Sequence, residues 1–197
     1  MMTCTPIWRD PAAFQSGDIL GVARIVKWWN PKHFFSWRIQ ADTKSPYNHV
    51  GMLEWYAGEW HVIEALWKGG LVRRPLKIYA NAKYRLTVGE WTLDRAHRRS
   101  AANWLKVRIG APYDKWKIVK LRLLQIVLGV DSVRRMLTGE NDDALICSES
   151  VIRAIRETGP ALFDCGDYAG PGSVMRAVAD GAYRWWDGKA WTEAPWG

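Results

Sequence analysis

Cys147 is the residue whose position in the sequence most directly suggests chemistry. Apolar residues recur at helical spacing over 144–159, and Gly159 is placed to end that helix with a positive φ. Asp142 and Asp143, just upstream, are predicted to cap the helix or favour its positive end. Cys147 then falls in the first turn, where unpaired backbone N–H groups favour the nucleophilic thiolate form. The alternative is a small core residue, as most free cysteines are.

A base and an orienting carboxylate are predicted on one β-hairpin. Residues 45–66 contain two strand-like runs around a two-residue turn that includes Gly58. With either possible turn, His49 and Glu64 share one face of the hairpin and His61 lies on the other. With the earlier turn, Glu64 is diagonal to His49 and roughly 7 Å away. A carboxylate at that range would hold an imidazole in one tautomer, although each residue alone is more often structural.

A metal hydrolase built from His49, His61 and Glu64 is the less favoured reading of this hairpin. The two histidines are predicted to face opposite sides, and the sequence contains no H-E-x-x-H spacing. We therefore predict no metal site and no cofactor.

The bulk composition describes an ordinary globular chain with a basic surface. It has 197 residues, 48% of them hydrophobic, 14 tryptophans and a formal net charge of +8. These values predict one main domain and an anionic partner, either nucleic acid, a membrane surface or a cell-wall polymer. No nucleic-acid recognition motif accompanies the charge, so a specific nucleic acid is not expected. Three cysteines without paired spacing, and no apolar leader segment, favour a cytoplasmic protein without disulfides.

The remaining pattern predicts a mixed α+β fold with an antiparallel sheet. Further strands are expected within 17–26, 71–76 and 84–88, and helices over 92–109, 116–130 and 173–179. The helix over 116–130 is apolar nearly all round with basic residues between, which favours burial over contact with a membrane or wall. Arg73, Arg74 and Lys77 are interpreted as a solvated sheet edge. The tail 182–197 is predicted to form a hairpin with Asp187-Gly188 in a type I′ turn.

Five short motifs in this order resemble the permuted NlpC/P60 cysteine hydrolases of the YiiX/YebB-like branch. They are Gly17-Asp-Ile, Ser45-Pro-Tyr-Asn-His-Val-Gly51, Glu64-Ala, Gly110-Ala-Pro-Tyr-Asp114 and Cys147-Ser-Glu. Together they span roughly residues 17–175. The Ser45–Gly51 motif and the Cys147-Ser-Glu motif are the specific part of the resemblance.

The resemblance implies a circularly permuted papain-like fold, with a Cys-bearing helix packed on an antiparallel sheet. It implies a nucleophile at Cys147, a base at His49 and an orienting residue at Glu64. Backbone N–H groups at the helix start would meet the developing oxyanion. Candidate oxyanion or substrate-positioning side chains are Tyr47, Tyr113 and Ser148. We expect a hydrolase domain over 1–180 and a Trp-rich hairpin over 181–197 packed on it.

The implied reaction is cleavage of an amide bond through a thioester, with cell-wall peptides as the expected substrate. Lipid-directed acyl hydrolases or acyltransferases also occur in the family, so an ester substrate is the alternative. A non-catalytic module for anionic wall or membrane surfaces is a further alternative, and it would bind in a salt-sensitive way. The absent signal peptide suits either a cytoplasmic enzyme or a phage lytic enzyme released to the wall.

Overall fold

The computed structural model describes a seven-stranded sheet, three α-helices and one short 3₁₀ helix. The described residues are 14–25, 36–37, 40–41, 45–89, 91, 94–114, 146–159, 170–177, 183–186 and 191–193. The strands are β1 (Ile19–Arg24), β2 (His49–Tyr56), β3 (Glu59–Leu66), β4 (Gly70–Pro75), β5 (Tyr84–Gly89), β6 (Tyr183–Trp186) and β7 (Trp191–Glu193). The helices are η4 (Leu76–Tyr79), α2 (Arg95–Lys106), α5 (Cys147–Thr158) and α6 (Pro171–Ala177). The helix predicted over 116–130, together with Asp142 and Asp143, lies outside the described residues.

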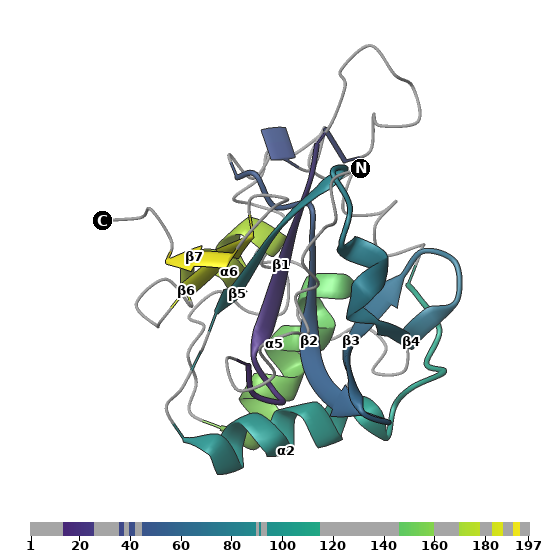
Figure 1. Ribbon diagram of the computed structural model, residues 1–197. Coiled ribbons are helices and arrows are strands. Elements are labelled where there is room, and N and C mark those ends of the chain that lie inside the picture. The colour runs from purple at the N-terminus through teal and green to yellow at the C-terminus, as the bar shows by residue number, and fades with distance from the viewer. Residues whose placement is uncertain are drawn as a thin grey trace.

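The strands form one antiparallel sheet, as the predicted α+β class requires. Their order is β4-β3-β2-β1-β5-β6-β7, so β1 lies between β2 and β5 near the middle (Figure 1). Glycine and polar residues punctuate the sequence between short β-branched and aromatic runs, which favours hairpins over crossovers. Among the described residues, no helix is long and apolar enough to cross a bilayer.

The hairpin that carries His49 and Glu64 has the earlier of the two predicted turns. Tyr56 pairs with Glu59, so Ala57 and Gly58 form the turn, and both have positive φ. The prediction of the turn and of the shared face is therefore confirmed by the register. Because side chains alternate along a strand, this register places His49 and Glu64 on the same side of the sheet.

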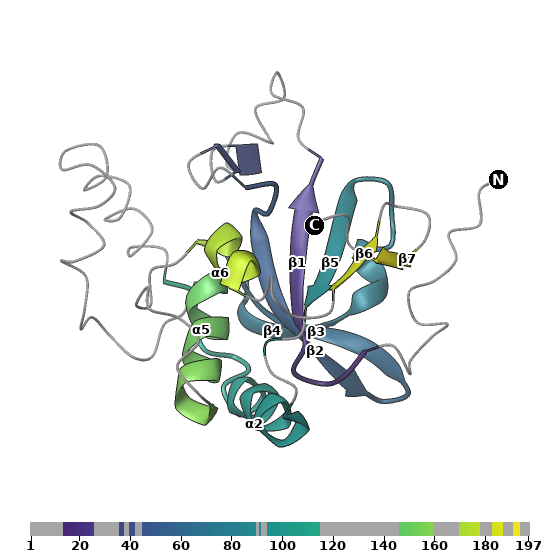
Figure 2. The ribbon, with the colours of Figure 1, turned by 90° about the vertical axis from the view of Figure 1, so that its left-hand side faces the viewer.

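Both faces of the sheet are covered by apolar side chains. Helices α2, α5 and α6 lie on one face, as Figure 2 shows, over a core that includes Met52, Ile63 and Ile155. The other face carries a second core, in which Leu20 and Leu53 meet the η4 turn. Alternating strand residues contribute to the two cores, so each strand is buried on both sides. Helix α5 is thereby fixed in place against β2 and β3.

Helix α2 is capped at its start by the side chain of an aspartate. The side chain of Asp94 accepts a hydrogen bond of 2.7 Å from the backbone N–H of Ala96, an N-cap arrangement that stabilises helix starts. The helix ends at Lys106 rather than at the predicted Ile109, and Gly110 follows with a φ of 99°. Gly110 N–H donates to Leu71 O and Leu71 N–H to Ala111 O, each over 2.8 Å, so this turn is tied to β4.

Helix α5 starts at Cys147, in agreement with the predicted first-turn position. Its N-cap is Ile146, whose backbone N–H donates over 3.4 Å to the Glu149 carboxylate, half of a capping box. The predicted positive φ at Gly159 is wrong, because its φ of −152° and ψ of −173° are extended. Gly159 is instead required by a close approach: a Cβ there would lie 2.9 Å from the Trp91 ring.

The substitution Gly159→Ala is expected to destabilise the fold by roughly 1–3 kcal/mol, because the added methyl overpacks against Trp91. Urea unfolding of the variant measures the loss. In a Trp91→Leu background the same methyl meets a smaller side chain, so Gly159→Ala is expected to lower the free energy of unfolding by less than it does in the wild type. Equal costs in the two backgrounds would contradict the clash with Trp91.

The tail strands extend the sheet beyond β5. Strand β6 pairs with β5, and β7 pairs with β6, so the predicted hairpin is confirmed. The Asp187-Gly188 turn predicted between them lies outside the described residues. The domain boundary at 180/181 stays a prediction.

Candidate active site

The His49 imidazole contacts a carboxylate and interacts with a thiol. Its Nε2 contacts Glu64 Oε2, and a side-chain hydrogen bond with Cys147 is among the causes that raise the pKa of the ring. His49 begins β2, Glu64 comes from β3, and Cys147 begins α5. The three predicted residues are thus brought together from three elements.

Glu64 is fully buried and is held by three donors. Besides His49, Tyr79 Oη donates to its Oε2 over 2.5 Å, and Arg74 Nε donates to its Oε1 over 2.8 Å. Burial by itself raises the pKa of Glu64, but the hydrogen bonds from His49 and Tyr79 and the nearby positive charges outweigh it. The net pKa of Glu64 lies below its usual value, so the carboxylate stays ionised.

The charge state of His49 follows from these neighbours. Burial disfavours the imidazolium and lowers the pKa of His49, but the hydrogen bonds with Cys147 and Glu64 and their negative charges raise it to about 10. At neutral pH the ring therefore carries its proton as an imidazolium, the form that can donate a proton to a leaving group. The side chain of His49 retains 15% of its exposure, so the ring is open to solvent on one side.

Cys147→Ala is expected to lower the pKa of His49 from about 10 but to leave it above 6.5, because Glu64 remains. A raised folded-state pKa contributes stability that is fully present below pH 6.5 and is lost as the pH rises through about 10. In the variant this alkaline loss is expected to be smaller and to be complete at a lower pH. An NMR titration of the His49 ring, assigned with His49→Ala, measures the shift. An unchanged pKa would mean that the thiol does not contact the ring.

The start of α5 supplies the environment of the thiol. Cys147 is half-buried, and its own carbonyl accepts a hydrogen bond of 2.8 Å from Ser150 Oγ. Glu149 is fully buried and pairs with Arg153 over 2.9 Å, one helical turn further on. The buried carboxylate is thereby neutralised close to the thiol. The first backbone N–H groups of α5 have no intrahelical partner and can stabilise negative charge.

The three candidate oxyanion side chains lie in different surroundings. Tyr47 is buried, and its hydroxyl is engaged by Thr87 Oγ1 at 2.9 Å. Tyr113 is half-buried; burial first, then the charge on Cys147, raises its pKa, so it keeps its proton close to the thiol. Ser148 is 2% exposed and belongs to the first turn of α5. Their catalytic roles stay predictions.

Two residues that hold Glu64, Arg74 and Tyr79, were not predicted from the sequence. The interpretation of the β4 cations as a merely solvated edge is wrong, because Arg74 pairs with buried Glu64 and Arg73 pairs with Glu54, 6% exposed, over 2.6 Å. Face arithmetic applied to the β3–β4 hairpin would have found Arg74. Its partner on β3 is Val62, two residues from Glu64 on the same face. No strand pattern points to Tyr79, which lies in the η4 turn.

His61 takes no part in this cluster. As predicted, it faces the side of β3 opposite to Glu64, where its ring packs edge-on against Tyr56 at 5.4 Å. Within the described part of the chain, no three His, Cys, Asp or Glu side chains are grouped to hold a metal ion.

Comparison with solved structures gives a distant structural likeness. No family model matches the chain, and no curated protein matches it. The crystal structure of the metalloprotein yiiX from Escherichia coli O157:H7, described as DUF1105, superimposes with a TM-score of 0.47 at 25% sequence identity. The match covers 73% of this chain and 66% of that chain. That structure bears the name of the YiiX/YebB-like branch that the sequence motifs resemble. Membership of this chain in that branch stays a prediction.

Proposed function

We propose that this chain is a cysteine hydrolase that cleaves amide bonds through a thioester acyl-enzyme. One observation supports the proposal above the others: the His49 ring contacts the Glu64 carboxylate, and an interaction with Cys147 contributes to its raised pKa. A nucleophile, a base and an orienting group in contact are the parts that this chemistry needs. The overall fold that we propose for it is the circularly permuted papain-like one.

In the proposed reaction, Cys147 Sγ attacks the substrate carbonyl as a thiolate and forms a tetrahedral oxyanion. Backbone N–H groups at the start of α5 stabilise that oxyanion, with the Tyr113 hydroxyl as a candidate further donor. The His49 imidazolium gives its proton to the leaving nitrogen as the C–N bond breaks, leaving a thioester. His49 then takes a proton from water, whose oxygen attacks the thioester; the C–S bond breaks, the acid leaves, and the Cys147 thiolate and the His49 imidazolium are restored. Glu64 keeps the ring oriented throughout.

The proposed substrates are peptides of the bacterial cell wall, on the basis of the sequence motifs. A basic chain of net charge +8 is suited to anionic wall or membrane surfaces. We propose a cytoplasmic location, or release to the wall in the case of a phage lytic enzyme.

Labelling with an iodoacetamide probe, followed by peptide mapping, tests this function. Cys147 is expected to be labelled faster than Cys4 or Cys165, and His49→Ala is expected to remove that advantage. Pre-incubation with peptidoglycan fragments is expected to protect Cys147, whereas a lipid-ester panel is not. Protection by lipid esters alone would redirect the proposal to an acyl hydrolase. Equal labelling of the three cysteines would contradict it.

A further inference from the structure

A cavity lies away from the Cys147 cluster, near the turn of the β2–β3 hairpin that carries His49 and Glu64. It has a volume of about 420 Å³, within the usual range for small-molecule sites. Trp55, which lines it, stands six positions further along β2 than His49, a distance of about 20 Å along a strand. A ligand in this cavity is therefore distinct from a substrate at Cys147.

One side of the cavity is an aromatic wall. Trp60 packs edge-on against Phe14 at 5.7 Å and against Trp55 at 5.2 Å between ring centroids. Trp60 and Phe14 are buried, whereas Trp55 keeps 44% of its exposure and offers ring surface to the cavity. The Trp60 indole N–H is buried without a hydrogen-bond partner. Rings held in this way can accept a flat apolar group against them.

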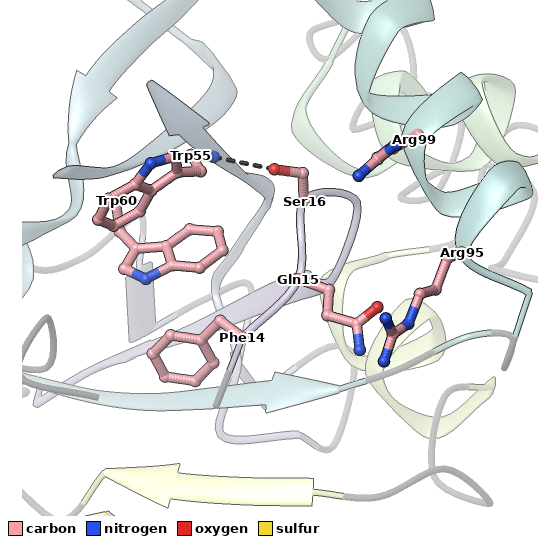
Figure 3. A pocket seen from close by; sticks show the side chains of 7 residues that line it. All are labelled: Phe14, Gln15, Ser16, Trp55, Trp60, Arg95 and Arg99. Carbon is pink, nitrogen blue, oxygen red and sulfur yellow. Dashed lines mark hydrogen bonds between the residues drawn. The ribbon is translucent and has the colours of Figure 1, made fainter. Parts of the chain in front are cut away.

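The opposite side is cationic. Arg95 and Arg99 stand one turn apart on α2, both exposed, and Figure 3 shows them across the cavity from the aromatic rings. Within the described part of the chain neither forms an ion pair. By contrast, Arg98 on the same helix is 2% exposed and donates to Asp18 over 2.9 Å. Two exposed guanidinium groups beside an aromatic wall suit an oxyanion.

The polar groups between the two sides also remain as donors. Ser16 Oγ already accepts from the backbone N–H of Trp55 over 2.9 Å, which leaves its hydroxyl hydrogen to donate. Gln15 Oε1 already accepts from Arg98 over 2.8 Å, which leaves its amide NH₂ to donate. The polar lining thus presents donors and no carboxylate. Such a lining selects an acceptor-only group.

We propose that this cavity binds a small ligand that joins an oxyanion, carboxylate or phosphate, to a flat apolar ring. The oxyanion lies between Arg95 and Arg99, with Ser16 and Gln15 as further donors. The ring lies on Trp55 and Trp60. This site is independent of the proposed hydrolysis, and its test uses no catalytic readout.

The test is calorimetric titration of the full chain with three probes: 2-naphthyl phosphate, 2-naphthoate and the uncharged 2-naphthalenemethanol. At least one anionic probe is expected to bind about tenfold more tightly than the alcohol, and the tighter of the two identifies the natural oxyanion. The indole N–H signals of Trp55 and Trp60, assigned with Trp→Phe variants, are expected to shift with saturation.

Matched double variants separate the site from the general surface charge. Arg95→Gln with Arg99→Gln is expected to weaken anion binding at least about tenfold. Lys83→Gln with Arg85→Gln removes the same charge from exposed positions at the start of β5, the end of the strand away from Ser16. This double variant is expected to change binding less than about twofold. Equal losses in the two double variants, tighter binding of the alcohol, or no binding of either anion would overturn the proposal.

Discussion

Cys147→Ala is expected to lower kcat/KM for a cleaved peptide by at least about 10⁴-fold, because loss of a covalent nucleophile removes the reaction path itself. The fold is expected to persist, since Cys147 is half-buried and contributes its backbone, not its side chain, to the start of α5. Initial rates with the variant, together with its urea unfolding curve, measure the two effects.

Cys147→Ser is the matched control for this result. The serine keeps the size and the hydrogen bond to His49 but is a far weaker nucleophile when its proton must be removed. Its activity is expected to stay close to that of the alanine variant. Cys165→Ala, which removes another thiol, is expected to keep full activity. Near-normal turnover by Cys147→Ala would end the hydrolase proposal. Circular dichroism of the variant shows whether the fold persists, so that a loss of activity through unfolding is recognised.

Glu64→Gln is expected to reduce kcat roughly 10²- to 10⁴-fold, the range seen when an orienting carboxylate beside a catalytic histidine becomes an amide. The amide carries no charge to hold the His49 imidazolium, and it presents two N–H donors where the carboxylate accepted from His49, Tyr79 and Arg74. The pH–rate profile of the variant, compared with the wild type, measures the change. A wild-type profile and rate would contradict an orienting role.

The same substitution is expected to change stability in a pH-dependent way. The pKa of Glu64 is lowered by folding, so its ionisation stabilises the protein above its usual 4.5 and that stability is lost as the pH falls. The variant is therefore expected to lose less stability between pH 6 and pH 3 than the wild type does. Glu64→Ala is expected to cost about 3–5 kcal/mol at neutral pH, because Arg74 and His49 lose a buried partner.

Glu54→Gln is the matched control on the other face of the hairpin. Glu54 is also nearly buried and also pairs with a β4 arginine, Arg73, over 2.6 Å, but it does not contact His49. Its loss is expected to reduce stability while leaving kcat near the wild-type value. If both variants lost activity equally, the effect of Glu64 would be a general consequence of weakening β2–β4.

The hairpin and its shared face were predictable because strand geometry is local. A two-residue turn and a period of two determine which side chains lie together, and no information from elsewhere in the chain is needed. The start of α5 at Cys147 followed from the spacing of Val151, Ala154 and Ile155, which are buried as that pattern requires.

The errors arose where long-range packing decides the structure. The sequence around Gly159 is typical of a helix stop, but the residue lies close to the ring of Trp91, which is far away in the sequence. The support of Glu64 by Tyr79 depends on how the η4 turn packs across the sheet.

The order in which the three residues occur along the chain has a consequence for biosynthesis. His49 and Glu64 sit on adjacent strands and can meet as soon as their hairpin has left the ribosome, whereas α5 is made much later. Until α5 docks on β2 and β3, the thiol has no imidazole beside it and behaves as an ordinary cysteine. In a nascent chain, Cys147 is thus expected to react with electrophiles no faster than an ordinary cysteine. A faster reaction of Cys147 then becomes a marker of completed folding.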